Sequence, residues 1–212
     1  MTNDLKRSQL RAIQYFYADG SCEFAFGLFC LLLGVYFFVE SHVRGWLSLV
    51  LDASLVLVVL GGAWLTNRLV RQLKENITWP RTGYVAYTRQ HGLRRRIRVV
   101  IGMLVGGVVA AAAAALIIDP TIHVATMPLL SGLLLGLVLA ILGWRAKLPR
   151  FYLLAGLSAL AGIALAFSGI ENFSGLPIYY LGMSLVLFAS GACVLRAYLR
   201  QNPEKAGDSD EQ

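Results

Sequence analysis

Residues 151–170 read FYLLAGLSALAGIALAFSGI and contain no charged side chain. A helix of about 20 apolar residues, rising 1.5 Å per residue, crosses the roughly 30 Å hydrocarbon core of a bilayer. The stretch is apolar on every face, whereas a strand of a membrane barrel alternates and ends after about ten residues. A backbone in lipid must satisfy its own hydrogen bonds, so the stretch predicts a transmembrane helix.

Five further apolar stretches of similar length lie along the chain, separated by polar and charged residues. Together they predict an all-α fold, a polytopic bundle of six transmembrane helices. The expected spans are approximately residues 21–39, 46–66, 99–118, 127–144, 151–170 and 178–198. They leave an N-terminal segment (1–20), a long loop (67–98) and a polar tail (199–212), with no room for a large soluble domain. In the N-terminal segment, Leu10, Ile13 and Tyr17 have the spacing of an amphipathic surface helix, although a solvated leader fits as well.

Composition supports a membrane protein rather than a soluble one. Hydrophobic residues make up 57% of the 212 residues, whereas soluble domains hold about 45–50%. The net charge is +7, which in a soluble protein would suggest a nucleic-acid partner. In a chain of six spans the positive-inside rule explains this charge, and we expect no nucleic-acid partner.

The basic residues orient the bundle. With six spans, all 19 Lys and Arg residues except Arg44 fall on one side. Loops in the cytoplasm are enriched in Lys and Arg, so both termini and loop 67–98 are predicted to be cytoplasmic, in the inner membrane of a cell. Aromatic residues mark the same boundary, because their rings favour the headgroup level. Those at the inner boundary are Trp64, Trp144, Phe151, Tyr152 and Tyr198.

The long loop is the most distinctive segment, because it is strongly basic and its one acidic residue is Glu75. We expect the second helix to continue to Glu75 or Asn76 and to end before Pro80. Basic side chains near an anionic leaflet contribute about 1 kcal/mol each, which favours binding of anionic lipid headgroups or of an acidic partner. Alternatively, these charges only set the topology. The residues expected to bind are Trp79, Arg81, Tyr84, Arg94, Arg95, Arg96 and Arg98.

Residues 78–85 of this loop, TWPRTGYV, resemble a TYPRxGYV-type loop of small, uncharacterised bacterial membrane proteins. The resemblance covers about ten of the 212 residues, and Trp79 stands where tyrosine is usual. It implies a location in the bacterial inner membrane and says nothing about activity.

Two carboxylates fall in or near the spans. Asp52 is predicted about 9 Å along the second helix if that helix begins at Trp46, and ionisable residues at such depth often mark ion or proton paths. If the helix begins later, Asp52 is instead its N-cap at the interface. Glu23 lies at the inner end of the first span, where it either pairs with an arginine of the long loop, such as Arg98, or relays protons.

Motifs for conventional chemistry are absent from the sequence. The three cysteines lie in or beside apolar stretches without CxxC spacing, which favours simple packing over disulfides or zinc. No span contains a histidine, and phosphate-binding loops such as GxxxxGK[ST] are missing. We therefore predict no catalytic residue, no metal site and no cofactor, and the sequence leans away from an enzyme.

Small residues indicate where helices approach closely. Small residues recur at a four-residue spacing in three spans, which is typical of contacts between membrane helices. They are Gly102 and Gly106, Gly132 and Gly136, and Ser158, Gly162 and Ala166. The leading functional hypothesis is a structural or accessory membrane protein that binds lipid or a partner through its basic loop. The alternative is a transporter or channel for a small solute or ion, acting as a homo-oligomer, with Asp52 in its path.

Overall fold

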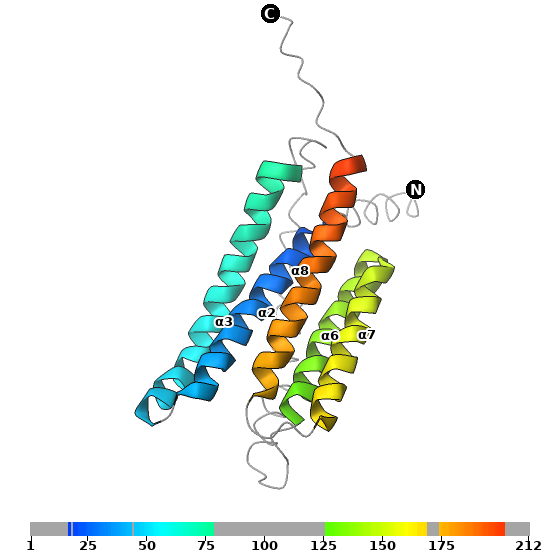
Figure 1. Cartoon of the computed structure of the whole chain (residues 1–212). Coiled ribbons are helices and arrows are strands. Elements are labelled where there is room, and N and C mark those ends of the chain that lie inside the picture. The colour runs from blue at the N-terminus through cyan, green and yellow to red at the C-terminus, as the bar shows by residue number, and fades with distance from the viewer. Residues whose placement is uncertain (1–16, 18, 44, 79–125, 169–173, 202–212) are drawn as a thin grey trace, which may run out of the picture.

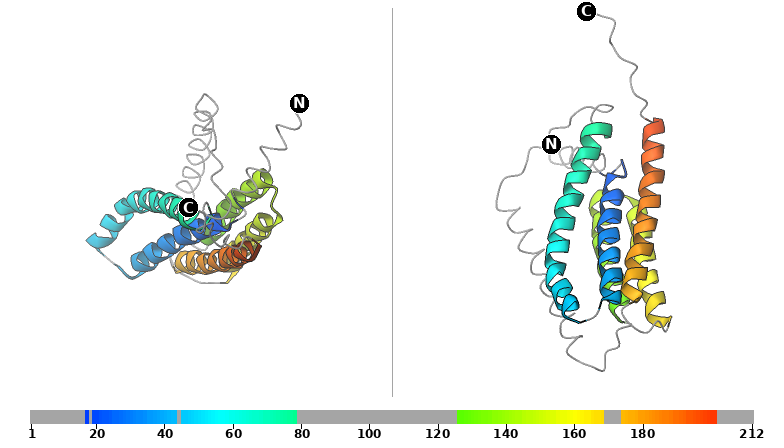
Figure 2. Two further views of the ribbon diagram at one scale, coloured as in Figure 1. Left: turned by 90° about the horizontal axis from the view of Figure 1, so that it is seen from above. Right: turned by 60° about the vertical axis from the view of Figure 1, so that its left-hand side comes forward.

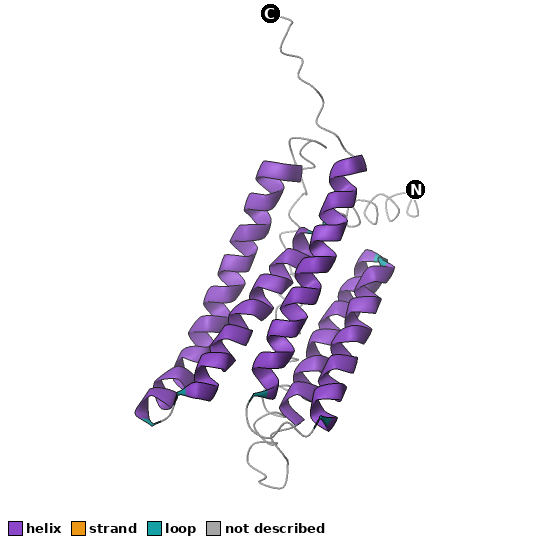
Figure 3. Ribbon diagram, in the orientation of Figure 1, coloured by secondary structure: helices purple, strands orange, loops and turns teal. Residues whose placement is uncertain are grey.

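A computed structural model describes residue 17 and residues 19–43, 45–78, 126–168 and 174–201, and the regular elements in these ranges are all helical (Figures 1 and 3). Five helices are long and apolar enough to cross a membrane. The elements are α2 (Ser21–His42), α3 (Trp46–Leu73), the π-helical turn η1 (Lys74–Thr78), α6 (Thr126–Ala146), α7 (Pro149–Phe167) and α8 (Gly175–Gln201).

These helices cover five of the six stretches in which a helix was expected, and the predicted third span (99–118) lies outside the described residues. The second helix continues past the apolar stretch, as expected, and extends through η1 to Thr78, two residues beyond Asn76. In contrast, α7 ends at Phe167, three residues earlier than expected. Pro149 begins α7, where a fixed φ and a missing N–H are best tolerated.

All Lys and Arg residues in the described ranges lie at one end of the bundle, the upper end in Figure 1, which we call the basic end. This end comprises the start of α2, the end of α3 with η1, the α6–α7 turn and the end of α8. Its basic residues are Arg68, Arg71, Lys74, Arg145, Lys147, Arg150, Arg196 and Arg200. We call the other end, where α3, α6 and α8 begin, the opposite end.

Helices α6 and α7 form an antiparallel pair whose backbones nearly touch. A Cβ atom on Gly132 would lie 2.8 Å from the Ser158 carbonyl oxygen, and one on Gly162 would lie 2.7 Å from that of Pro128. Gly136 approaches the backbone of Ala155 in the same way. The small residues predicted to make contacts on these two helices therefore meet each other, whereas Gly102 and Gly106 lie outside the described residues.

Helix α2 packs antiparallel along α8 and also contacts α3. Gly27 faces the Phe188 ring and Gly34 faces Leu181, so the α2–α8 contact is made by small residues that the sequence analysis did not single out. Helix α3 and the α6–α7 pair lie on opposite sides of α2 and α8 (Figure 2). Most apolar side chains of α3 face outward, and Leu57 is 71% exposed. Such a surface suits contact with lipid tails, which are as apolar as leucine.

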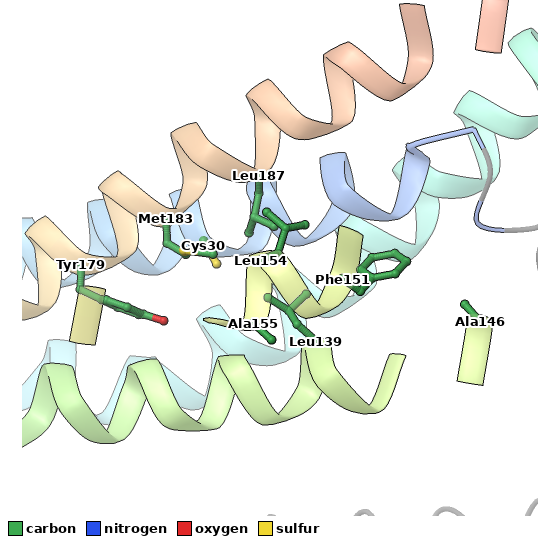
Figure 4. Close-up of a cluster of buried hydrophobic side chains, with 9 residues drawn as sticks. All are labelled: Cys30, Leu139, Ala146, Phe151, Leu154, Ala155, Tyr179, Met183 and Leu187. Carbon is green, nitrogen blue, oxygen red and sulfur yellow. The ribbon is translucent and has the colours of Figure 1, made fainter. Parts of the chain in front are cut away.

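The apolar core lies between α2 and α8 on one side and α6 and α7 on the other (Figure 4). In lipid, burying these side chains gains little from the hydrophobic effect, so close packing and hydrogen bonds supply most of the stabilisation. The core residues are Cys30, Leu139, Ala146, Phe151, Leu154, Ala155, Tyr179, Met183 and Leu187.

Candidate functional site

The start of α2 is held by a buried aspartate. Gly20 precedes the helix with a φ of 74°, and a Cβ there would lie 2.7 Å from the Gly191 carbonyl oxygen, so both its conformation and its surroundings require glycine. Asp19 Oδ1 accepts hydrogen bonds from the backbone N–H of Ser21 (3.1 Å) and from its hydroxyl (2.7 Å). This arrangement satisfies backbone groups that the first turn of a helix leaves without an intrahelical partner.

Asp19 also joins α2 to the end of α3. Lys74 Nζ, in the first position of η1, donates to Asp19 Oδ2 at 3.0 Å, and both side chains are almost completely buried. The carboxylate is therefore both paired and hydrogen-bonded, as a buried charge requires.

A second ion pair lies next to the first and connects α2 to α7. Arg150 Nε, in the first turn of α7, is 2.9 Å from Glu23 Oε1, and Arg150 Nη2 donates to the backbone carbonyl of Tyr17. The Tyr17 ring packs edge-on against Phe151, with 6.0 Å between ring centroids. Tyr17, Asp19 and Glu23 thus contact the end of α3 with η1 on one side and the start of α7 on the other.

The two buried pairs differ in how well their carboxylates are satisfied. Glu23 has no exposed surface, and neither of its carboxylate oxygens accepts a hydrogen bond from a residue that the structure describes. Its contact with Arg150 lacks hydrogen-bond geometry, so charge attraction alone holds this pair. Such an incompletely satisfied charge in an apolar setting is unusual, because its desolvation is costly.

A chain of uncharged hydrogen bonds lies about 12 Å further along α7. The Ser158 hydroxyl donates to the Gly132 carbonyl oxygen at 2.9 Å, and the Tyr179 hydroxyl lies 2.7 Å from Ser158 Oγ. Either hydroxyl can donate in the contact between them, and the Tyr179 hydroxyl also donates to the Ser131 carbonyl oxygen at 3.4 Å. This chain links α8 to both α6 and α7, and Figure 4 shows the Tyr179 side chain pointing from α8 towards them.

The structure places Asp52 within α3 and Glu23 beside an arginine. Helix α3 begins at Trp46 with Gly45 before it, so Asp52 lies within the helix and the N-cap interpretation is wrong. Glu23 does pair with an arginine at the inner end of the first helix. Its partner is Arg150 of α7, whereas Arg98, the arginine expected from the long loop, lies outside the described residues.

The residues predicted to bind lipid or a partner lie outside the described residues. These are Trp79, Arg81, Tyr84, Arg94, Arg95, Arg96 and Arg98. What the structure does place at the basic end is a set of exposed cations beside exposed tryptophans. The Arg68 guanidinium lies 5.4 Å from the centre of the Trp64 ring, and Trp144, which is 74% exposed, directly precedes Arg145.

Two of the aromatic residues expected at the inner boundary are buried within the bundle. Phe151 has no exposed surface and Tyr198 is nearly buried, whereas Trp64, Trp144 and Tyr152 are exposed as expected for a boundary. The sequence pattern does not distinguish a buried aromatic residue from a lipid-facing one at a helix end, because both lie at the same depth in the membrane.

The described residues contain no group of three or more His, Cys, Asp or Glu side chains that could hold a metal ion. Within those ranges the three cysteines are unpaired: Cys30 is buried in the core, Cys22 is half-buried and Cys193 is exposed. Comparison with protein-family models, with curated proteins and with solved structures finds no match.

Sequence reasoning missed Asp19, Lys74 and Tyr179. A signal for Asp19 was present, because Asp19 and Ser21 directly precede an apolar stretch, where capping residues are favoured. Lys74 counted in the sequence only as one of the basic residues that orient the bundle. Tyr179 resembled any boundary aromatic until the fold placed its hydroxyl beside Ser158.

Proposed function

We propose that this protein is a six-span integral membrane protein of the inner membrane, with both termini in the cytoplasm. In this proposal it acts as a structural or accessory component that binds anionic lipid headgroups at its basic end, principally through loop 67–98. The observation that carries the proposal is the segregation of every described Lys and Arg to one end of the bundle. Enzyme chemistry has no comparable support.

The ends of the described segments support an even number of spans. Helix α3 and η1 finish at the basic end, and α6 begins at the opposite end (Figure 1). The intervening residues, 79–125, must therefore connect the two ends of the bundle, which takes an odd number of crossings. Residues 99–118 are the apolar stretch in this interval that is long enough to cross once. One crossing there added to five helices makes six.

This topology predicts the side on which single cysteines react. In a variant whose three native cysteines are serine, Trp79→Cys is expected to react with a membrane-impermeant maleimide from the cytoplasmic side only. The matched variant Arg44→Cys is expected to react from the other side only. The measurement is labelling of intact cells compared with inside-out vesicles. Labelling of Trp79→Cys in intact cells would contradict the proposed orientation.

The exposed groups at the basic end suit anionic headgroups. Arg68 and Trp64 lie on one face of α3, with the cation over the ring, and Arg71 is largely exposed next to Glu75. Tryptophan favours the headgroup level, and arginine there meets lipid phosphates. Loop 67–98 adds further cations at the same end, and each contributes about 1 kcal/mol near an anionic surface.

Lipid selectivity tests this proposal. Replacing Arg94, Arg95, Arg96 and Arg98 together by glutamine is expected to lower the affinity for phosphatidylglycerol at least about tenfold, because cations worth about 1 kcal/mol each are lost. Affinity for phosphatidylcholine is expected to stay unchanged. Native mass spectrometry with each lipid titrated into the purified protein provides the measurement. Arg44→Gln, on the other side, is the matched control, and unchanged phosphatidylglycerol binding in the quadruple variant with intact topology would reject the proposal.

A second candidate function, transport of a small solute or ion, is favoured by the position of Asp52. Because α3 begins at Trp46, Asp52 lies about 9 Å along a helix, and carboxylates within membrane helices often lie on ion paths. In proteoliposomes, Asp52→Asn is expected to abolish a flux that the wild-type protein shows, while Glu40→Gln at the end of α2 leaves it intact. Equal flux in wild type and Asp52→Asn would exclude this role.

A further inference from the structure

The helices fall into two groups. Helices α2, α3 and α8 form one group, in which α8 and α3 both pack along α2; α6 and α7 form the other (Figures 1 and 2). Within each group glycines bring backbones into contact, as Gly34 does with Leu181 and Gly132 with Gly162. Between the groups the contacts are sparser and are made mainly by side chains of the apolar core (Figure 4).

Two polar links join the groups, and they differ in kind. The first is the uncharged chain from Tyr179 of α8 to Ser158 and the Gly132 carbonyl oxygen. Its two hydrogen bonds, of 2.9 and 2.7 Å, require the groups to stay in direct contact, whereas attraction between charges acts over a longer distance. A rotation of one group about this point keeps both bonds, since each is made by a hydroxyl that can turn.

The second link is the Arg150 side chain at the basic end. From the first turn of α7, its guanidinium forms an ion pair with Glu23 at the start of α2 and donates a hydrogen bond to the Tyr17 carbonyl oxygen. The Glu23 carboxylate accepts no hydrogen bond from a described residue, so little besides charge attraction holds it to Arg150. If the Arg150–Glu23 pair served only to hold the two helices together, apolar side chains of similar volume would make the protein at least as stable. The best-attested uses of buried ion pairs are to specify a register or to switch.

We propose that the two helix groups rock against each other, with the Arg150–Glu23 ion pair at the basic end as a latch and the Ser158–Tyr179 contact as the pivot. In the latched state, which the structure represents, the Arg150 side chain contacts Glu23 and the Tyr17 carbonyl oxygen. In the unlatched state Arg150 separates from Glu23, the α7 start moves away from the α2 start, and water enters to solvate both charges. The opposite end keeps its packing.

Distances between spin labels at the two ends test the latch. In a background with the three native cysteines replaced by serine, Asn67→Cys on α3 and Tyr152→Cys on α7 report on the basic end. Leu47→Cys and Phe167→Cys report on the opposite end of the same two helices, and Leu47, Tyr152 and Phe167 are all exposed. Double electron–electron resonance is measured in lipid nanodiscs for wild type, Glu23→Gln and the matched control Glu75→Gln, whose carboxylate makes the exposed pair with Arg71.

Glu23→Gln is expected to add a component at the basic end that is longer by about 5 Å, the size of a one-turn helix displacement in a switching contact. The pair at the opposite end is expected to keep its wild-type distance, which also shows that the bundle remains folded. Glu75→Gln is expected to change neither distance. An unchanged distance at the basic end in Glu23→Gln would overturn the latch, and broadening at both ends would overturn the pivot by showing general loosening.

Discussion

Arg150→Gln is expected to lower the free energy of unfolding by about 3 kcal/mol, because it leaves the Glu23 carboxylate buried without a countercharge. Removing one partner of a buried pair typically costs about 3–5 kcal/mol. The lower end applies here, since the Arg150 side chain is 23% exposed and some solvent already screens the pair. Loss of the hydrogen bond from Arg150 to the Tyr17 carbonyl oxygen also destabilises the folded protein.

The neighbouring pair supplies the comparison. Lys74→Gln also leaves a buried carboxylate, but Asp19 keeps two hydrogen bonds from Ser21, whereas Glu23 has none from a described residue. Lys74→Gln is therefore expected to cost less than Arg150→Gln. Glu23→Gln is also expected to cost less, because the guanidinium that remains is 23% exposed and can be solvated.

Unfolding in mixed micelles with increasing sodium dodecyl sulfate measures these differences. The expected order of destabilisation is Arg150→Gln first, followed by Lys74→Gln and Glu23→Gln. If Arg150→Gln were as stable as wild type, Glu23 would not be held as a buried charge, and the account of the basic end would be wrong.

Gly162→Ala is expected to lower the free energy of unfolding by about 2–3 kcal/mol, the upper part of the range for overpacking. The added Cβ would lie 2.7 Å from the Pro128 carbonyl oxygen and 3.0 Å from the Gly132 Cα. Both are backbone atoms, so no side chain can rotate away and the helices must separate. Separation would also weaken the contact between Ser158 and the Gly132 carbonyl oxygen.

Gly156→Ala on the same helix is the matched control, because a Cβ there meets nothing within 4 Å. Alanine favours a helix over glycine by up to about 1 kcal/mol, so this variant is expected to be neutral or slightly stabilised. Both variants are compared by the same detergent titration. Equal stability of the two would show that α6 and α7 do not approach as closely as the backbone contacts require.

Several features were predictable because they depend on local sequence. The apolar stretches at residues 151–170 and 178–198 predict helices, since lipid forces a backbone to bond within its own segment. The four-residue spacing of Gly132 and Gly136 on α6 and of Ser158 and Gly162 on α7 predicted close contact, and the structure joins these two sets. Neighbouring helices with a short turn have few alternatives to packing against each other.

Other features were not predictable because they join distant residues. The sequence offers many arginines for Glu23, and nothing local distinguishes Arg150 from Arg98. The same holds for Gly27 and Gly34, which face α8 although the sequence separating them from it is long. The position of Asp52 depended on where α3 begins, and a glycine with positive φ at residue 45 decided this.

By itself, the sequence determined that the described residues form long apolar helices suited to a lipid environment. It also determined that the described Lys and Arg residues gather towards one end. Hydropathy and charge are properties of each segment, and they decide separately for each segment whether it crosses a bilayer and in which orientation. Only the tertiary structure decided which helices meet, and hence that Asp19, Glu23, Lys74 and Arg150 share one buried cluster. Lipid tails contact every apolar face equally well, so the choice of neighbour depends on matching shapes and charges across the chain.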